Sequence, residues 1–360
     1  MNEVHNGLEG IVAAETRLSM VDGERGELVI GGYAVEELAS WGFEDVASLL
    51  WGLAGFEGKP AVCALPPHTL QLLRDVAPKR VPVMDALRMA AGTLSAEDDA
   101  DAARMLAGSF PVIVAAYWRL LHGVEPLAPR AELGIAANYL YLLTGREPHA
   151  ELVRGLETYL NTVVDHGLNA STFTARVVAS TGSDFVSAIV GAVGALKGPL
   201  HGGAPGPALD MVFEIGEASR AEGVLRAKIA AGERLMGFGH RVYKVRDPRA
   251  DVLAAAAERM FTRAGDMSLY NLARDVEATA LRLLEEHKPG RKLQTNVEFY
   301  TALLLHGLGL EVPLFTPTFA VARVVGWLAH AFEQRRVGRI IRPQSVYVGE
   351  RHGAAAAYAG

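Results

Sequence analysis

Apolar residues recur at intervals of three and four along most of the chain beyond Tyr33, a spacing typical of amphipathic helices. The pattern predicts helices through nearly the whole of this region, and Pro111 is expected to kink or interrupt the helix that contains it. The expected helices span residues 35–38, 46–53, 83–94, 102–122, 133–143, 151–164, 170–178, 185–196, 208–217, 223–231, 249–261, 269–286, 297–308 and 318–334.

The N-terminal segment has a different pattern. Residues 11–30 carry β-branched side chains on both sides of Asp22-Gly23, a dipeptide that favours tight hairpin turns. This predicts a short β-hairpin. Strands do not alternate with the helices that follow, so a parallel α/β sheet is excluded and the predicted class is mainly α.

Length and composition narrow the possibilities. The chain has 360 residues, half of them hydrophobic, which supports a large core in one or two domains. Glycine-containing turns at 202–206 and 309–313 are the best domain boundaries, and residues 353–360 have the composition of a frayed tail. The net charge of -6 is unlike that of a general nucleic-acid binder.

Targeting and redox features are few. Cys63 is the only cysteine, which excludes an intrachain disulfide and a multi-cysteine metal site. The first residues do not form a secretory signal, and the longest apolar runs are shorter than the ~20 residues of a membrane span. We therefore expect a cytoplasmic protein without a membrane segment.

Three polar blocks interrupt the apolar pattern, at residues 198–204, 237–249 and 295–300. Each places one proton-handling side chain, His201, His240 or Glu298, beside glycines or at a helix start, where backbone can approach a ligand. A local basic cluster accompanies them: Arg234, Arg241, Lys244, Arg246, Arg249, Arg291 and Lys292. Two imidazoles, a carboxylate and several cations suit acid–base chemistry on a small anionic carbonyl compound.

Each block also has a simpler interpretation. His201 could be a turn histidine, His240 a structural one, and Glu298 a first-turn charge that complements the helix dipole. A hydrolase oxyanion loop at His201 would need a Gly-x-Ser-x-Gly elbow, and the chain has none. Asp247-Pro248-Arg249 has the pattern of a helix start, with Asp247 as cap. Neither a His-Glu-x-x-His zinc motif nor a Walker phosphate loop is present, so no metal is expected.

At these blocks the chain resembles the citrate synthase family, whose members condense an acyl-CoA with an oxoacid. The resemblance runs from residues 8–11 and 22–23 to residues 319–327 and 341–343. It implies the compact bacterial or archaeal type, a homodimer with a large helical domain (1–203 and 310–360) and a small one (204–309). No tightly bound cofactor is implied; a coenzyme A thioester and oxaloacetate are the substrates.

The resemblance also implies roles for individual residues. His201 corresponds to the histidine that hydrogen-bonds the acetyl-CoA carbonyl, His240 to the one that polarises oxaloacetate, and Glu298 to the catalytic base. His166, Arg249, Arg323 and Arg342 correspond to groups that bind oxaloacetate or citrate, the last usually from the partner subunit. Coenzyme A would lie near Leu235, Gly237 and Gly239, with Lys244, Arg291 and Lys292 at its phosphates.

One position departs from the family pattern, because most members carry aspartate where this chain has Glu298. The extra methylene moves the carboxylate by about an ångström unless the backbone compensates, and such a shift can cost roughly a hundredfold in rate. Two alternatives stay open: a 2-methylcitrate synthase, which uses propionyl-CoA on the same scaffold, and a helical binding or regulatory protein that has lost catalysis, for which Glu298 is the only hint.

Overall fold

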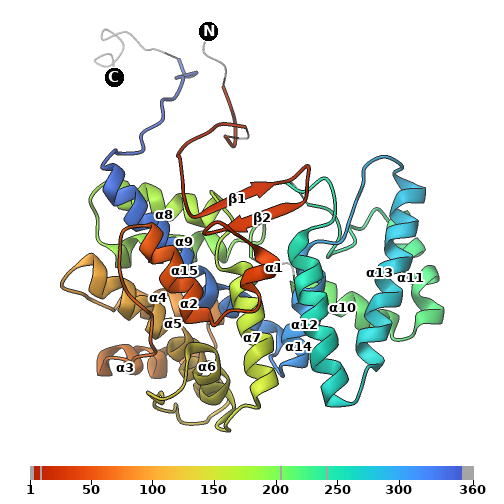
Figure 1. The fold of residues 1–360 in the computed structure, drawn as a ribbon, viewed down its shortest axis with the longest axis horizontal. Helices are drawn as coiled ribbons and strands as arrows, with labels where there is room; N and C mark the ends of the chain where they lie inside the picture. The colour runs from red at the N-terminus through yellow and green to blue at the C-terminus, as the bar shows by residue number, and fades with distance from the viewer. Residues whose placement is uncertain (1–3, 9, 203–204, 241, 351–360) are drawn as a thin grey trace, which may run out of the picture.

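Helix α15, Phe315–Val337, forms the centre of the molecule, and helices from distant parts of the chain pack around it (Figure 1). It contacts α2, α5, α7, α8 and α9, and the indole Nε1 of Trp51 on α2 donates to the Val325 carbonyl at 3.2 Å. The segment Val312–Val337 is long and apolar enough to cross a membrane, but 78% of its apolar stretch is buried within the protein. It is therefore a core helix of this fold.

The structure is a computed structural model that describes residues 4–8, 10–202, 205–240 and 242–350. Within these residues the first helices are α1 Val35–Leu38, α2 Phe43–Leu53, α3 Pro67–Val76, α4 Val83–Ala91, α5 Asp99–Leu121, α6 Ile135–Thr144, α7 Ala150–Val163, α8 Ala170–Ser180 and α9 Phe185–Leu196. The later ones are α10 Pro205–Ile215, α11 Ala218–Ala230, α12 Pro248–Ala264, α13 Ser268–His287, α14 Val297–Gly307 and α15. Short 3-10 turns lie at Ala77–Lys79 and Val312–Leu314.

The predicted N-terminal hairpin is confirmed. Strands β1 Ser19–Asp22 and β2 Glu27–Ile30 pair antiparallel with Asp22 opposite Glu27, and β3 Tyr33–Ala34 adds a third short strand. The Asp22 carboxylate accepts hydrogen bonds from the N–H groups of Glu24 and Arg25, which stabilises the turn. The hairpin tip packs closely on the loop that contains Val242. A Cβ added at Gly23 would lie only 2.1 Å from the Val242 carbonyl oxygen, so this contact requires glycine.

The mainly α prediction is confirmed, with two local differences. Helix α5 continues through Pro111, so of the kink or interruption expected there the interruption is wrong; packing against α4, α6 and α15 keeps the helix continuous. Helix α3 was not predicted; of its apolar residues Leu70, Leu72, Leu73 and Val76, only Leu73 and Val76 are buried.

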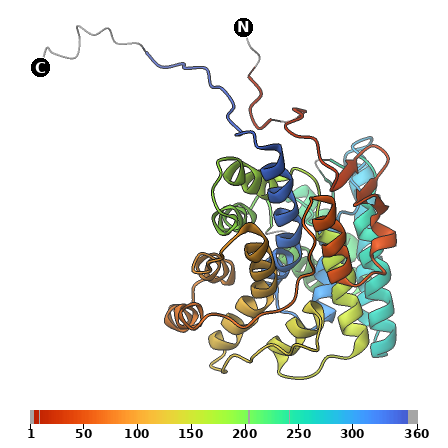
Figure 2. The same cartoon turned by 60° about the vertical axis from the view of Figure 1, so that its left-hand side comes forward.

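Helices α10 to α14 pack mainly on one another and lie together on one side of the molecule (Figure 1). Helix α12 joins them to the rest through contacts with α1 and α7. The predicted domain boundary at residues 203 and 204 lies outside the described residues. The Ile341 N–H donates to the Ser180 hydroxyl at 3.0 Å, and beyond this contact the C-terminal segment extends away from the helices (Figure 2).

Candidate active site

The second and third polar blocks lie against each other. Phe238 forms an isolated antiparallel bridge with Thr295, and the Gly239 N–H donates to the Gln294 carbonyl at 2.7 Å. Asn296 completes the junction: its side-chain amide donates to the Gly239 carbonyl at 2.8 Å, and its Oδ1 accepts from the Glu298 N–H at 3.0 Å. This junction places the His240 loop beside the first turn of α14, which carries Glu298.

This loop requires glycine at two positions because its backbone lies close to neighbouring side chains. Gly237 has φ +90°, and a Cβ there would lie 2.9 Å from the Cβ of Phe299. Gly239 has φ +81°, and its Cβ would lie 3.1 Å from a methyl group of Leu293. Leu235, just before them, is buried. The loop backbone can therefore pack flat on the start of α14 only with glycine at these two positions.

The protonation of His240 follows from its partners. Its Nδ1 accepts hydrogen bonds from the backbone N–H groups of Val242 at 3.0 Å and Tyr243 at 3.1 Å. The proton of the neutral ring therefore lies on Nε2. Burial, with the nearby charge of Arg249, lowers the pKa of His240 to about 4, so the ring is a neutral donor at neutral pH.

His166 lies next to His240. The two ring centroids are 5.9 Å apart, edge to face, and His166 Nε2 is 3.1 Å from the Tyr243 hydroxyl. Burial lowers the pKa of His166 well below 6.5, helped by the charges of Arg249 and Arg323. Tyr243 belongs to the second polar block, but nothing in the sequence marked it as a partner of a residue 77 positions away.

Arg249 and Asp247 form a buried ion pair at the start of α12. The guanidinium donates through Nε at 3.0 Å and through a terminal nitrogen at 2.8 Å to the two oxygens of Asp247. As predicted, Asp247 caps α12, with Pro248 in the first turn; it also accepts from the Val297 N–H at 3.2 Å. One carboxylate thus joins the starts of α12 and α14.

Arg323 is the second buried guanidinium, only 1% exposed. Its Nε donates to the Val163 carbonyl at 2.7 Å, and the group lies 4.6 Å from the ring centroid of Phe319. Burial lowers the pKa of Arg323 to about 10, so the side chain stays charged at neutral pH. It also contributes to the lowered pKa values of His166 and His201.

His201 is oriented by α8 and α15. Its Nε2 lies 2.8 Å from the Ser171 hydroxyl, which accepts from the Trp327 indole at 3.1 Å and donates to Asn169 Oδ1 at 2.8 Å. Its ring packs edge-on against Phe319 at 6.5 Å. Burial lowers the pKa of His201 to about 4, which makes this ring neutral as well. Sequence reasoning missed Ser171, although it lies in the segment that follows Asn169.

Glu298 has an unusual environment. Its Oε2 is buried and has no hydrogen-bond partner, and burial raises the pKa of Glu298 to about 7 in spite of the positive charge of Arg249. A carboxylate with this pKa is an effective base near neutral pH. A base, two neutral imidazole donors and two buried guanidinium groups together suit proton removal from one substrate and binding of an anionic second one.

Not every predicted residue joins this cluster. Arg342 is exposed in the C-terminal segment, which leaves the body of its own chain (Figure 2). Lys244, Arg291 and Lys292 have exposed side chains, the last two in the turn before α14. Arg246 is paired with Glu277 and Asp251, and Arg241 lies outside the described residues. Among the residues that the structure describes, no group of His, Cys, Asp and Glu is arranged to hold a metal ion.

Comparison with known proteins adds independent information. A family model described as "Citrate synthase, C-terminal domain" matches residues 7–344. The chain is 39% identical to citrate synthase 2 of Bacillus subtilis over 95% of each chain, and 38% identical to the citrate synthase of Haloferax volcanii over 97% of each.

Solved structures agree in fold. The citrate synthase of Pyrobaculum aerophilum superposes with a TM-score of 0.86 at 35% identity, covering 97% of this chain and 93% of its own. That of Thermoplasma acidophilum, solved in a ternary complex with carboxymethyl coenzyme A and oxaloacetate, gives 0.87 at 28% identity, with 98% of both chains covered.

Proposed function

The chain belongs to the citrate synthase family, and we propose that the cluster around His240 and Glu298 carries out its condensation of acetyl-CoA with oxaloacetate. The observation that carries this proposal is the buried, unpartnered Oε2 of Glu298 with a pKa near neutrality, next to a glycine loop that ends in a neutral histidine. A first-turn glutamate that merely complements the helix dipole would be exposed.

Oxaloacetate binds first in this scheme. The buried guanidinium groups of Arg249 and Arg323 neutralise its carboxylates, since a planar guanidinium binds a carboxylate in bidentate fashion. His240 donates its Nε2–H to the ketone oxygen and polarises the carbonyl group. His166 provides a further hydrogen bond, and the Tyr243 hydroxyl sets the orientation of its ring.

Glu298 then removes a methyl proton from acetyl-CoA, and His201 donates a hydrogen bond to the thioester oxygen as negative charge develops there. This donation uses the His201 tautomer with its proton on Nδ1, so Nε2 becomes an acceptor. In this tautomer the single hydroxyl proton of Ser171 turns from Asn169 Oδ1 to Nε2 of His201, while Asn169 Oδ1 keeps its bond from the Thr172 N–H.

The enolate carbon attacks the polarised ketone, which forms the new carbon–carbon bond of citryl-CoA. Water then cleaves the thioester and releases citrate and CoA. The backbone from Leu235 to Gly239 approaches the CoA chain closely because its glycines lack side chains. Lys244, Arg291 and Lys292 carry positive charge on exposed side chains and would bind its phosphates.

The larger organisation is part of the same proposal. Residues 204–309 form a small domain against a large domain of residues 1–203 and 310–360, and the grouping of α10 to α14 supports this. We infer a homodimer in which the C-terminal segment carries Arg342 into the partner's site, because Arg342 is exposed in a segment that extends away from the helices (Figure 2). The long apolar helix is buried, which supports a cytoplasmic protein.

A thiol-release assay with oxaloacetate and acetyl-CoA tests the assignment. We expect His201→Ala and Glu298→Gln to abolish CoA release while oxaloacetate still protects the protein against thermal unfolding. His306→Ala, an exposed position on the same helix as Glu298, is the matched control and should keep wild-type activity. Comparing kcat/KM for acetyl-CoA and propionyl-CoA separates the 2-methylcitrate alternative. CoA release by the Glu298 variant at the wild-type rate would refute the proposed base.

A further inference from the structure

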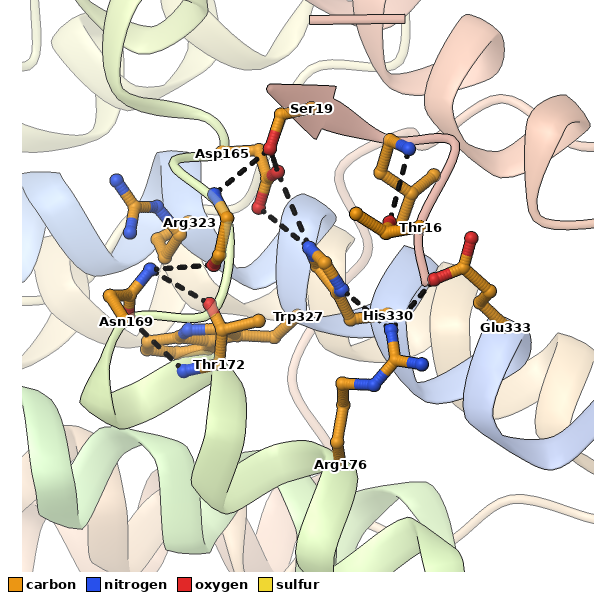
Figure 3. A network of polar contacts seen from close by, with 12 residues as sticks. Thr16, Ser19, Asp165, Asn169, Thr172, Arg176, Arg323, Trp327, His330 and Glu333 are labelled. Carbon is orange, nitrogen blue, oxygen red and sulfur yellow. Dashed lines mark hydrogen bonds and ion pairs between the residues drawn. The ribbon is translucent and has the colours of Figure 1, made fainter. Parts of the chain in front are cut away.

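One face of α15 reaches the site at three points. Arg323, Trp327 and His330 are spaced by four and three residues, so their side chains lie on the same face of the helix. Arg323 is itself a site residue, and Trp327 reaches His201 through Ser171. His330 has no role so far, and it contacts Asp165, the residue directly before His166 (Figure 3).

The hydrogen bonds of His330 have a defined direction. The ring is fully buried, with Nε2 at 3.2 and 3.3 Å from the two oxygens of Asp165 and Nδ1 at 2.9 Å from a terminal nitrogen of Arg176. A guanidinium can only donate, so Nδ1 accepts and the proton of the neutral ring lies on Nε2. His330 therefore donates to Asp165.

Arg176 is held in turn by the C-terminal half of α15. The same terminal nitrogen donates to Glu333 at 2.7 Å, and its Nε donates to the side-chain oxygen of Gln334 at 3.0 Å. The network Glu333–Arg176–His330–Asp165 is thus a continuous buried chain in which each donor has an acceptor (Figure 3). Apolar side chains of the same volume would stabilise a core as well as such a network, so stability alone does not account for it.

The segment held by this network is the turn that carries His166. Ser19 donates to the Asp165 carboxylate and accepts from the Gly167 N–H at 2.9 Å, so it joins the residues on both sides of His166. Helix α15 also packs closely on this turn, because a Cβ added at Gly326 would lie only 2.3 Å from the Val164 carbonyl oxygen. The direction of the His166 ring therefore depends on where Asp165 is held.

We propose that His330, acting through Asp165, is a positioning residue that holds His166 in the orientation that binds oxaloacetate. This inference rests on the proposed role of His166 in oxaloacetate binding. Without the donor at His330, Asp165 is free to turn toward other partners, and the His166 turn loses its fixed geometry. Binding of acetyl-CoA, which is assigned to other segments, is unaffected at saturating oxaloacetate.

Two substitutions at His330 separate the loss of its hydrogen bond to Asp165 from the loss of side-chain volume. His330→Gln keeps an N–H group at the reach of Nε2, whereas His330→Asn keeps an acceptor near Nδ1 for Arg176 but no donor for Asp165. We expect the Asn variant to raise the KM for oxaloacetate about 10- to 100-fold, the effect of losing a hydrogen bond to a charged group. The Gln variant should stay within about threefold of wild type, and the KM for acetyl-CoA should be unchanged in both.

Asn138→Ala is the matched control for lost stability, because the Asn138 amide is buried and donates to the carbonyls of Arg130 and Leu133, away from the site. It should lower the melting temperature without changing the KM for oxaloacetate. Ser19→Ala tests the same turn independently if the Asn variant does not fold, and should raise that KM about 2- to 10-fold.

The outcomes are distinct. The positioning role would be overturned if the folded His330→Asn variant had an unchanged KM for oxaloacetate. If that variant does not fold, an unchanged KM in Ser19→Ala would overturn it. So would equal impairment in the Gln and Asn variants. A wild-type chain that releases no CoA would instead overturn the proposed function, and this inference with it.

Discussion

The Ser171 hydroxyl lies 2.8 Å from Nε2 of His201. This contact decides which nitrogen of the ring carries the proton, and so whether His201 can donate to a thioester oxygen. Because burial keeps the pKa of His201 near 4, the ring has one proton to place at neutral pH, and the hydroxyl is the group that directs it.

Ser171→Ala should therefore affect turnover rather than oxaloacetate binding. We expect kcat to fall about 10- to 100-fold, because a misplaced donor loses most of its effect on the rate, while the KM for oxaloacetate stays within about twofold. Steady-state kinetics measures both values. Thr174→Ala on the same helix is the control, since its hydroxyl donates to the Ala170 carbonyl. Equal losses in the two variants would mean that Ser171 acts only through the stability of α8.

The pH dependence of activity should follow Glu298. Its pKa is about 7, whereas the pKa values of His201 and His240 are about 4, so of these three groups only the carboxylate titrates between pH 5.5 and 8. We expect kcat/KM for acetyl-CoA to fall about tenfold per pH unit below 7 and to level off above it. Carboxylate ionisation has a small enthalpy and imidazole ionisation a large one. A midpoint that shifts strongly with temperature would therefore assign the titration to a histidine.

The same burial makes Glu298 costly for stability. Its folded pKa is raised from 4.5 to about 7, so ionisation favours the unfolded state and the free energy of unfolding falls as pH rises through this range. Glu298→Gln removes the charge, and we expect this variant to be inactive yet about 2–4 kcal/mol more stable than wild type at pH 8. Near pH 4.5 the difference should vanish. Urea unfolding at both pH values measures it, and equal stability at pH 8 would show that the carboxylate is not buried.

Gly237 offers a test of the contact between the His240 loop and α14. Gly237→Ala combines φ +90° with an overlap against Phe299, whereas Gly232→Ala at φ +77° meets nothing within 4 Å. Both variants carry the backbone cost of a left-handed alanine, about 1–2 kcal/mol. Only Gly237→Ala should also lower kcat/KM, by at least about tenfold, because the loop must move away from Glu298. Matching kinetics in the two variants would contradict the contact.

The sequence predicted the helices and strands of this fold better than the contacts between them. Apolar spacing located α9 at its observed bounds, and the Asp247-Pro248 pattern marked the start of α12 because caps are local signals. It missed α3, which begins at Pro67 and buries only two of its apolar residues, Leu73 and Val76. The glutamate at 298 could be read as a base or as a helix-end charge until its burial was visible.

The polar networks behind the site were not predictable in the same way. Tyr243 contacts a histidine 77 residues earlier, and His330 contacts an aspartate 165 residues earlier. Neither pair forms a local pattern, and each side chain alone is compatible with an ordinary helix or turn. Such contacts arise only when the packing of α15 and the N-terminal hairpin brings distant segments together.

The position of Arg342 leads to a test by mixing subunits. Its segment leaves the body of its own chain after Ile341, and in the proposed homodimer Arg342 acts in the partner's site (Figure 2). Arg342→Ala and His240→Ala should each be nearly inactive as pure homodimers. In a mixed dimer, however, the chain with intact His240 receives an intact Arg342 from the other chain and forms one complete site.

Random reassortment makes half of the dimers mixed, each with one complete site of two, so about a quarter of wild-type activity should return after unfolding and refolding the variants together. Refolding each variant alone is the control and should restore none. Full activity of the pure Arg342→Ala dimer would exclude any role of this side chain. Inactivity of the mixture, with dimers confirmed by light scattering, would place both residues in the same subunit's site and refute the exchange.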